Sequence, residues 1–173
     1  MARGVVLRPD DTGCAALRAL WTALEDAGVP SVAAHRKGAH EPHLSLTVAA
    51  HLEVAEVLAV LSAATVLPSD TITFEAVAAF PQGVLFLSAV PDKRLLDAQR
   101  LAYEACAVAP STRSLWSYYS PGSWLPHVTL GYGLTGAEIG RSMEVLLPAL
   151  PLVVAGWTAW LEDGDTGESW PLR

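Results

Sequence analysis

One five-residue pattern occurs twice in this chain, and it restricts the possible folds more than any other feature. The segments Pro42–Leu46 (PHLSL) and Pro126–Leu130 (PHVTL) both begin with Pro-His and then alternate apolar and hydroxyl-bearing residues. This alternation is typical of a half-buried β-strand. The two histidines, His43 and His127, are separated by about half of the 173 residues. We therefore expect a chain built from two related halves.

The segments around these strands follow the same order in each half: a helix, a loop, the Pro-His strand, a second helix and further strands. The expected helices lie at about 11–27, 52–67, 92–107 and 135–147, and the expected strands at about 5–7, 43–48, 71–80, 84–90, 126–130, 152–161 and 170–172. Neither half has enough strands to enclose a core alone. We therefore predict one α+β domain over residues 1–173, with internal pseudo-repeats at about 11–90 and 92–173.

Capping residues mark where three of these helices begin. Asp11 or Thr12 is the expected N-cap of the first helix, and Asp92 that of the third. Thr135 and Glu138 have the spacing of a capping box at the start of the fourth.

Composition narrows the class of function. The chain is 51% hydrophobic and 17% charged, which excludes an intrinsically disordered protein because so much apolar surface can be buried. Its net charge of −7 argues against a protein that coats long nucleic acid, since that requires clustered Lys and Arg. A short nucleic acid or a single nucleotide remains compatible with this charge.

The sequence offers little sign of an oxidising compartment or a membrane. Cys14 and Cys106 are too few for a disulfide scaffold. The first ten residues contain no apolar run of signal-peptide length. The longest uncharged span, Val145–Leu161, contains two prolines and a glycine and is shorter than the ~20 residues that cross a bilayer. We predict a cytoplasmic protein with no membrane association and no obligate protein partner.

The two motifs predict a catalytic cleft. Residues i and i+2 of a strand share a face, so His43 lies beside Ser45 and His127 beside Thr129. Brought together, the two strands present two imidazoles and two hydroxyls. This set suits phosphodiester chemistry without a metal or other cofactor, because one neutral imidazole accepts a proton and the other, protonated, donates one. The hydroxyls would stabilise charge on the phosphate oxygens.

Paired His-x-Ser/Thr-x motifs in two halves resemble the two-histidine (2H) phosphoesterase superfamily, which includes bacterial 2'-5' RNA ligases and cyclic nucleotide phosphodiesterases. The resemblance implies that His43 and His127 are the catalytic pair and that Ser45 and Thr129 bind phosphate. It also implies two antiparallel β-sheets in a pseudo-two-fold bilobal arrangement, with helices on the outer faces and a central active-site cleft. The implied reaction is metal-independent cleavage of 2',3'-cyclic phosphates or 2'-5' phosphodiester bonds in nucleotides or short RNA, with ligation as its reverse.

Four further residues are candidates for binding the substrate. An aromatic loop over residues 116–124 carries Tyr119 and Trp124, whose rings can stack on nucleobases or pack on the edge of the domain. Tyr132 follows the second motif, where many 2H relatives carry a basic residue. Arg36 precedes the first motif and can contact phosphate or lie in a solvated turn. The expected partner is a nucleotide or a short RNA end.

Other interpretations stay open at this point. His35, His40 and His43 with Glu41 form a loop cluster that a metal-dependent hydrolase could use, but the spacing matches no tight metal-binding template and leaves the second motif unexplained. Gly131–Gly136 matches GxGxxG, yet no acidic residue follows where a dinucleotide site needs one. The chain could also bind a nucleotide or RNA end without turnover. The presence of both motifs argues against that interpretation.

Overall fold

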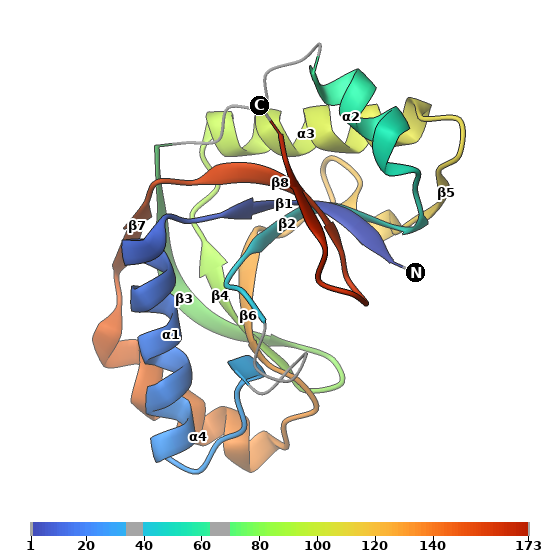
Figure 1. The fold of residues 1–173 in the computed structure, drawn as a ribbon. Coiled ribbons are helices and arrows are strands. Elements are labelled where there is room, and N and C mark those ends of the chain that lie inside the picture. The colour runs from blue at the N-terminus through green and yellow to red at the C-terminus, as the bar shows by residue number, and fades with distance from the viewer. Residues whose placement is uncertain (1, 34–39, 63–69, 173) are drawn as a thin grey trace.

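Nine antiparallel strands form one sheet in the computed structural model, which describes residues 2–33, 40–62 and 70–172 (Figure 1). The strands are β1 (Arg3–Arg8), β2 (Leu44–His51), β3 (Thr71–Phe80), β4 (Val84–Ala89), β5 (Arg113–Leu115), β6 (His127–Gly131), β7 (Leu152–Ala155), β8 (Thr158–Asp163) and β9 (Ser169–Pro171). Their order across the sheet is β7-β3-β4-β6-β2-β1-β8-β9, and β5 pairs with β2.

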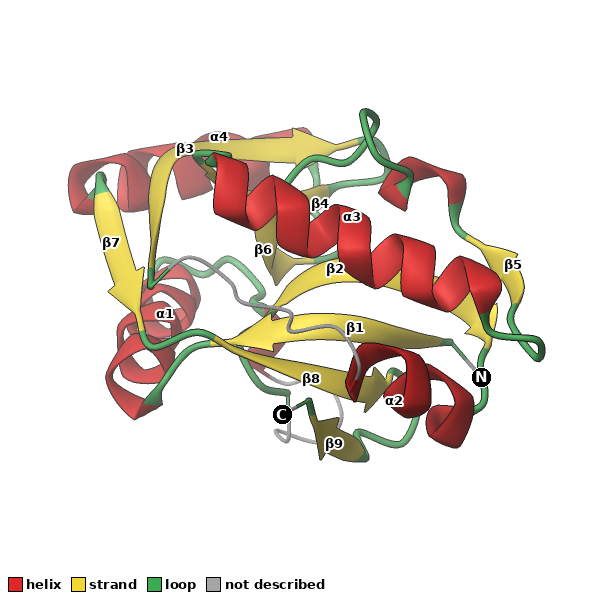
Figure 2. Cartoon of the chain, turned by 90° about the horizontal axis from the view of Figure 1, so that it is seen from above, coloured by secondary structure: helices red, strands yellow, loops and turns green. Residues whose placement is uncertain are grey.

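One pair of helices packs at the β7–β3 end of the sheet, and the other packs at β2. The helices are α1 (Asp11–Asp26), α2 (Val54–Ser62), α3 (Lys93–Val108) and α4 (Gly136–Leu146), with 3-10 helices η2 (Ser117–Tyr119) and η3 (Leu147–Ala149). α3 packs on β2 and contacts α2, whereas α1 contacts α4 and these two lie against β7 and β3 (Figures 1 and 2). Within the described residues, no helix combines the length and apolar composition needed to cross a bilayer.

Side-chain caps fix where the helices start. The Asp92 carboxylate accepts a hydrogen bond from the Leu95 amide at 2.7 Å, and Thr135 forms a complete capping box with Glu138, so both predicted caps are confirmed. The predicted cap of α1 is wrong by one or two residues. The cap is Asp10, whose carboxylate accepts from the Gly13 amide at 2.8 Å.

The two sides of the sheet meet where the two Pro-His strands lie side by side. β1, β2, β8 and β9 lie on one side and β3, β4, β6 and β7 on the other, and Leu44 of β2 pairs with Val128 of β6 to join them. The α+β class and the antiparallel strands are therefore confirmed. The two implied sheets are instead joined into one, because the motif strands pair directly. The pseudo-two-fold relation between the halves stays a prediction.

The two halves of the sequence are interleaved in the sheet. β3 follows β2 in the chain but pairs with β4 and β7, and β8 returns to pair with β1. The single strand expected at 152–161 is divided into β7 and β8 at Gly156, which has φ +71°. A side chain at this position would collide with Asp10. The chain thus crosses from one side of the sheet to the other at a glycine.

The motif strands alternate as the sequence predicts. Leu44, Leu46, Val128 and Leu130 are at most 1% exposed and belong to the hydrophobic core. The histidines and hydroxyl residues between them are partly exposed, so they project from the opposite face of the sheet. Burial of one face therefore fixes which face carries the polar motif residues.

Candidate active site

The sheet register places the four polar motif residues around one point. Residues on antiparallel strands oppose one another in reverse order on either side of a paired position. From the pair that joins β2 to β6, it follows that His43 lies across from Thr129 and Ser45 across from His127. Opposed residues on one face have Cβ atoms about 4.5–5.5 Å apart. The imidazoles therefore occupy one diagonal of this group and the hydroxyls the other.

These four side chains line a cleft with a volume of about 440 Å³. The rest of the lining comes from the β3–β4 turn and from the segments on either side of β6: Phe80, Gln82, Val84, Trp116, Tyr118, Tyr119, Ser123, Trp124, Leu125 and Tyr132. Among the described lining residues there is no Asp, Glu, Lys or Arg. The two imidazoles are thus the acid–base candidates in this lining.

Both imidazoles make the same backbone hydrogen bond. Nδ1 of His43 lies 2.8 Å from the carbonyl oxygen of Glu41, and Nδ1 of His127 lies 2.8 Å from that of Leu125. Because a carbonyl oxygen can only accept, each Nδ1 carries a hydrogen and each Nε2 is left to accept or donate a proton. The proline of each motif restricts the residue before it to extended backbone, which helps to direct these carbonyls.

His127 lies against an apolar wall. The rings of Phe80 and Phe86 stack with centroids 4.2 Å apart, and their centroids lie 5.0 and 5.2 Å from that of His127. Burial lowers the pKa of His127 below its usual value, the hydrogen bond to the Leu125 carbonyl opposes this, and the charge of His43 lowers it further. Burial thus favours the neutral form of His127.

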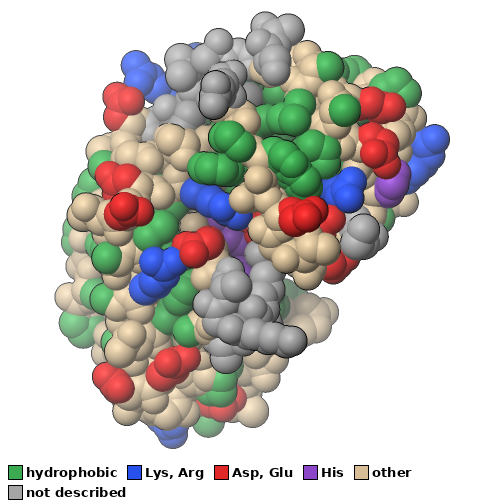
Figure 3. Space-filling view, in the orientation of Figure 1, with side chains coloured by type: hydrophobic (Ala, Val, Ile, Leu, Met, Phe, Trp, Pro, Cys, Tyr) green, Lys and Arg blue, Asp and Glu red, His purple; other side chains and the backbone are tan. Residues whose placement is uncertain are grey.

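His43 has different neighbours. Its ring centroid lies 5.2 Å from that of His40, which is buried and packs 5.8 Å from Trp21. The described residues contain no group of three His, Cys, Asp or Glu side chains that could hold a metal ion. His35, the remaining histidine of the alternative metal cluster, lies outside the described residues. In Figure 3, a histidine is visible in a hollow with both cationic and anionic side chains at its margin.

The loop before β6 is tied to β2 by hydrogen bonds. The Trp124 indole donates to the Ser45 carbonyl at 3.0 Å, and the Gln99 amide of α3 donates to the carbonyls of Leu46 at 3.3 Å and Tyr119 at 2.5 Å. Tyr119 is 7% exposed. Burial raises the pKa of its phenol, and interaction with the Ser45 side chain partly offsets this. Trp124 and Tyr119 are thus fixed parts of the cleft wall rather than freely exposed rings.

Three other aromatic rings are exposed at the cleft. Trp116, Tyr118 and Tyr132 are 36%, 57% and 48% exposed. Burial raises the pKa of the Tyr118 phenol, and the neighbouring Tyr132 adds to this effect. The predicted binding residue Tyr132 therefore lines the cleft with much of its ring accessible. Arg36 lies outside the described residues.

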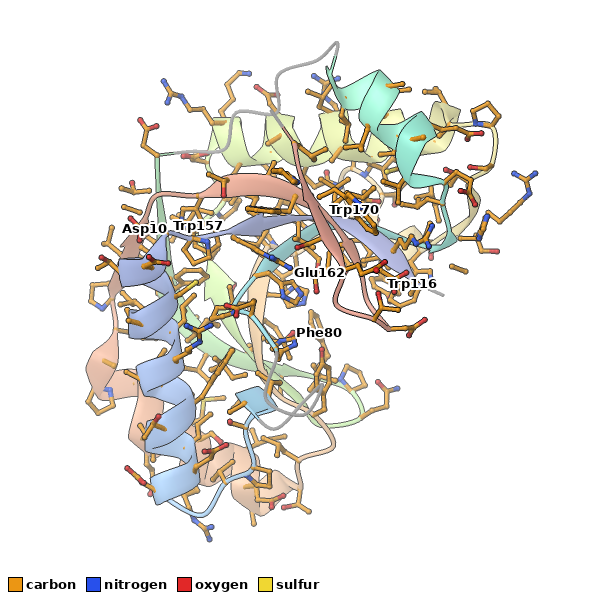
Figure 4. All side chains as sticks on the ribbon, viewed as in Figure 1. Asp10, Phe80, Trp116, Trp157, Glu162 and Trp170 are labelled. Atoms are coloured by element: carbon orange, nitrogen blue, oxygen red, sulfur yellow. The ribbon has the colours of Figure 1, made fainter. Side chains whose placement is uncertain are left out.

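Sequence reasoning did not assign Phe80, Gln82, Val84, Ser123 or Leu125 to the cleft, nor Phe86 to its wall. Phe80 and Phe86 belong to the predicted β3–β4 hairpin, but the pairing of Phe86 with Thr129 of β6 had no local signal. Gln82 has φ +67°, a conformation that residues other than glycine seldom adopt. The Pro-Gln-Gly turn sequence was the available signal for Gln82. Figure 4 labels Phe80, the last residue of β3, and Trp116, which follows β5, and both line the cleft.

The sequence also matches a known protein family. The sequence model of the 2'-5' RNA ligase superfamily matches residues 9–166, a span that includes both motifs and every residue of the cleft lining. The chain belongs to this superfamily. Membership in the 2'-5' RNA ligase superfamily places it among phosphoesterase-like enzymes. No curated protein gives a significant match to the sequence.

Solved structures show the same fold at low sequence identity. The superfamily member is similar to Usb1 of Kluyveromyces marxianus, with a TM-score of 0.54, 12% identity and coverage of 99% of this chain and 98% of that one. A structure described as a phosphoesterase gives a TM-score of 0.59 at 15% identity, covering 99% and 94% of the two chains. Kluyveromyces marxianus Usb1 with uridine monophosphate gives 0.50 at 12% identity, covering 99% and 98%. At these identities the likeness concerns the fold.

Proposed function

We propose that this superfamily member cleaves 2',3'-cyclic phosphates, or 2'-5' phosphodiester bonds, of nucleotides or short RNA ends without a metal ion. The observation that carries the proposal is the arrangement of His43 and His127. Both have Nδ1 fixed as a donor to a backbone carbonyl, and they lie diagonally across the join of β2 and β6 with a hydroxyl opposite each. This arrangement supplies an acid and a base to one phosphate.

The reaction follows from the two Nε2 atoms. Neutral His127 accepts a proton from water as the water oxygen bonds to phosphorus. The bond from phosphorus to the leaving sugar oxygen breaks, and His43, protonated at Nε2, donates its proton to that oxygen. Each transfer typically contributes ~10²–10⁴ in rate. Ligation uses the same groups: a sugar hydroxyl of a second nucleotide, in place of water, bonds to the phosphorus of a 2',3'-cyclic phosphate and gives its proton to His127. The bond from phosphorus to the 3' oxygen breaks, and His43 protonates that oxygen, which leaves a 2'-5' phosphodiester.

The surroundings of the two histidines support this division of roles. A general base must be neutral at the working pH, and burial against Phe80 and Phe86 lowers the pKa of His127. The resemblance to 2H phosphoesterases assigns the same roles, with the second histidine activating water and the first protonating the leaving oxygen. His43 is thus proposed as the acid.

The rest of the lining supports a nucleotide-like substrate with one negative charge between the histidines. Ser45 and Thr129 can donate hydrogen bonds to the non-bridging phosphate oxygens, where negative charge develops. The uncharged, ring-rich lining suits a phosphodiester monoanion attached to a nucleobase. That a protein with this fold was solved with uridine monophosphate supports a nucleotide as the class of ligand.

The proposal is tested with purified protein in chelator, using nucleoside 2',3'-cyclic phosphates and 2'-5' linked dinucleotides. Turnover is expected to persist in chelator and to be lost in His43→Ala and His127→Ala. His51→Ala is the matched control, because His51 is exposed at the opposite end of β2 from His43, which directly precedes that strand. Complete loss of turnover in chelator, or full activity in both motif variants, would contradict the proposal. Binding of these compounds without turnover would support the non-catalytic alternative instead.

A further inference from the structure

A cationic side chain lies beside His43 on the face of the sheet that carries the cleft. Val6 of β1 pairs with Ser45 of β2. Continuing this antiparallel register by two residues places Arg8, the last residue of β1, across from His43. Side chains two apart in a strand share a face. Arg8 therefore projects from the same face as Ser45 and His43, one strand further from β6.

The Arg8 guanidinium is fixed in position from three directions. Nη2 lies 2.7 Å from Oε2 of Glu162, and Nη1 donates to Oγ of Ser169 at 3.2 Å. The guanidinium carbon lies 5.2 Å from the centroid of the Trp160 ring. The Arg8 side chain is 16% exposed and that of Glu162 3%. Figure 4 labels Glu162, which comes from β8.

These contacts do not use all the hydrogen-bonding capacity of Arg8. A guanidinium has five N–H donors, and the two bonds to Glu162 and Ser169 occupy one on each Nη. Nε of Arg8 is buried without a hydrogen-bond partner among the described residues. Buried donors are rarely left unpaired. An oxygen of a bound anion is the acceptor that a guanidinium with free, fixed donors binds best.

The position of Arg8 relative to the reacting phosphate suggests which anion it would bind. Neighbouring strands are about 4.8 Å apart, so the backbone of Arg8 lies one such step beyond that of His43, on the side away from β6, and its guanidinium lies over β8 and β9. Successive phosphates of one strand are joined through a single sugar, so a second phosphate lies next to the reacting one. The described cleft lining itself offers no Lys or Arg. A second phosphate of the substrate would therefore reach Arg8 when the first lies between the histidines.

We propose that Arg8, supported by Glu162, Trp160 and Ser169, forms a second phosphate subsite that binds the phosphate one nucleotide away from the reacting bond. The inference rests on the proposed function and refines its substrate class. The substrate is then an oligonucleotide end rather than a mononucleotide, because a nucleoside cyclic phosphate has no second phosphate for Arg8 to bind.

The test compares two substrates that differ by that phosphate. One is a nucleoside 2',3'-cyclic phosphate, and the other is a dinucleotide of the same bases that ends in a 2',3'-cyclic phosphate. Arg8→Gln is expected to lower the ratio of their kcat/KM values, dinucleotide over mononucleotide, by about tenfold to a hundredfold, the effect of one lost hydrogen-bonded charge contact. Arg3→Gln is the matched control. It removes the arginine at the other end of β1, whose ion pair with Asp163 is of the same kind, and the ratio should not fall.

The outcomes separate the subsite from the proposed function. If Arg8→Gln leaves the ratio of the two kcat/KM values unchanged, whether or not both values fall, Arg8 is structural and the subsite is overturned while the proposed function stands. If the wild-type protein turns over neither substrate, the proposed function fails and the subsite with it.

A measurement on the wild-type protein covers the case in which Arg8→Gln does not fold. For single strands, log K falls with log salt by about 0.7 for each phosphate contact. The kcat/KM for the dinucleotide should therefore fall more steeply with salt than that for the mononucleotide, by a slope of about 0.7. Equal slopes for the two substrates would overturn the subsite.

Discussion

The two motif strands carry the same local pattern but lie in different surroundings. On β6, His127 is enclosed by Phe80 and Phe86, and burial lowers its pKa. On β2, the neighbours of His43 are His40, at 5.2 Å between centroids, and by register Arg8. The hydrogen bond from Nδ1 to the carbonyl two residues earlier is 2.8 Å long on both strands.

The comparison separates what the motif determines from what the fold adds. The motif positions each imidazole and fixes its tautomer, because those contacts are made within three residues of the chain. Whether an imidazole serves as acid or as base depends on its neighbours, which come from β3 and β4 for His127 and from β1 for His43. A repeated motif therefore supplies two equivalent groups, and packing makes them different.

The largest effect is expected from removing either imidazole. His43→Ala and His127→Ala should each lower kcat by about 10²–10⁴, the typical value of one proton transfer. Because both imidazoles serve one transition state, the double variant should lose less than the product of the two single losses. Steady-state kinetics on a cyclic phosphate substrate measures all three. A loss in the double variant equal to the product would show that the two histidines act independently.

A smaller effect is expected from the hydroxyls on the other diagonal. Ser45→Ala and Thr129→Ala should each cost about 2–3 kcal/mol of transition-state stabilisation, as for removing one donor from a site that stabilises developing charge. The loss should fall on kcat. Thr129→Ser keeps the hydroxyl and serves as the control. If Thr129→Ser loses as much as Thr129→Ala, the methyl group of the threonine matters rather than its hydroxyl.

The apolar wall around His127 predicts the acidic limb of the pH profile. A base acts when neutral, so kcat/KM should fall as the pH drops through the pKa of His127, which lies below the usual value of 6.5. Phe80→Ala admits water to the ring and should move this limb toward higher pH, lowering kcat/KM near the limb by up to about tenfold. Phe80→Leu keeps the wall apolar and should leave the limb in place. Movement of the basic limb instead would assign the base to His43.

The local parts of this site could be predicted from the sequence. Alternation within PHLSL and PHVTL identifies the faces of both strands, and the Asp92 and Thr135 caps mark two helix starts, because these features depend on residues a few positions apart. The cap of α1 was misplaced because Asp10, Asp11 and Thr12 are all capable N-caps.

The contacts that make the two strands different could not be predicted. The pairing of Phe86 with Thr129, the position of Arg8 across from His43 and the division of the last long strand at Gly156 all depend on which strands become neighbours. Strand neighbours are set by packing of the whole sheet and leave no local pattern. For the same reason, the direct pairing of β2 with β6 joined two expected sheets into one.

The smallest effect is expected from Tyr132, an aromatic residue on the β6 side that has no aromatic counterpart on the β2 side. Five residues after each histidine lie Val48 and Tyr132. The Val48 carbonyl accepts a hydrogen bond from the Trp116 amide at 3.0 Å, whereas Tyr132 lines the cleft with its ring 48% exposed. Stacking of a base on an aromatic ring contributes ~1–3 kcal/mol, and a half-exposed ring belongs at the lower end of that range.

Tyr132→Ala should therefore raise KM about fivefold with little change in kcat, because the ring would bind the base and not the reacting phosphate. Tyr132→Phe keeps the ring and should retain the wild-type KM. A KM in Tyr132→Phe as high as in Tyr132→Ala would assign the contact to the phenol hydroxyl instead of the ring.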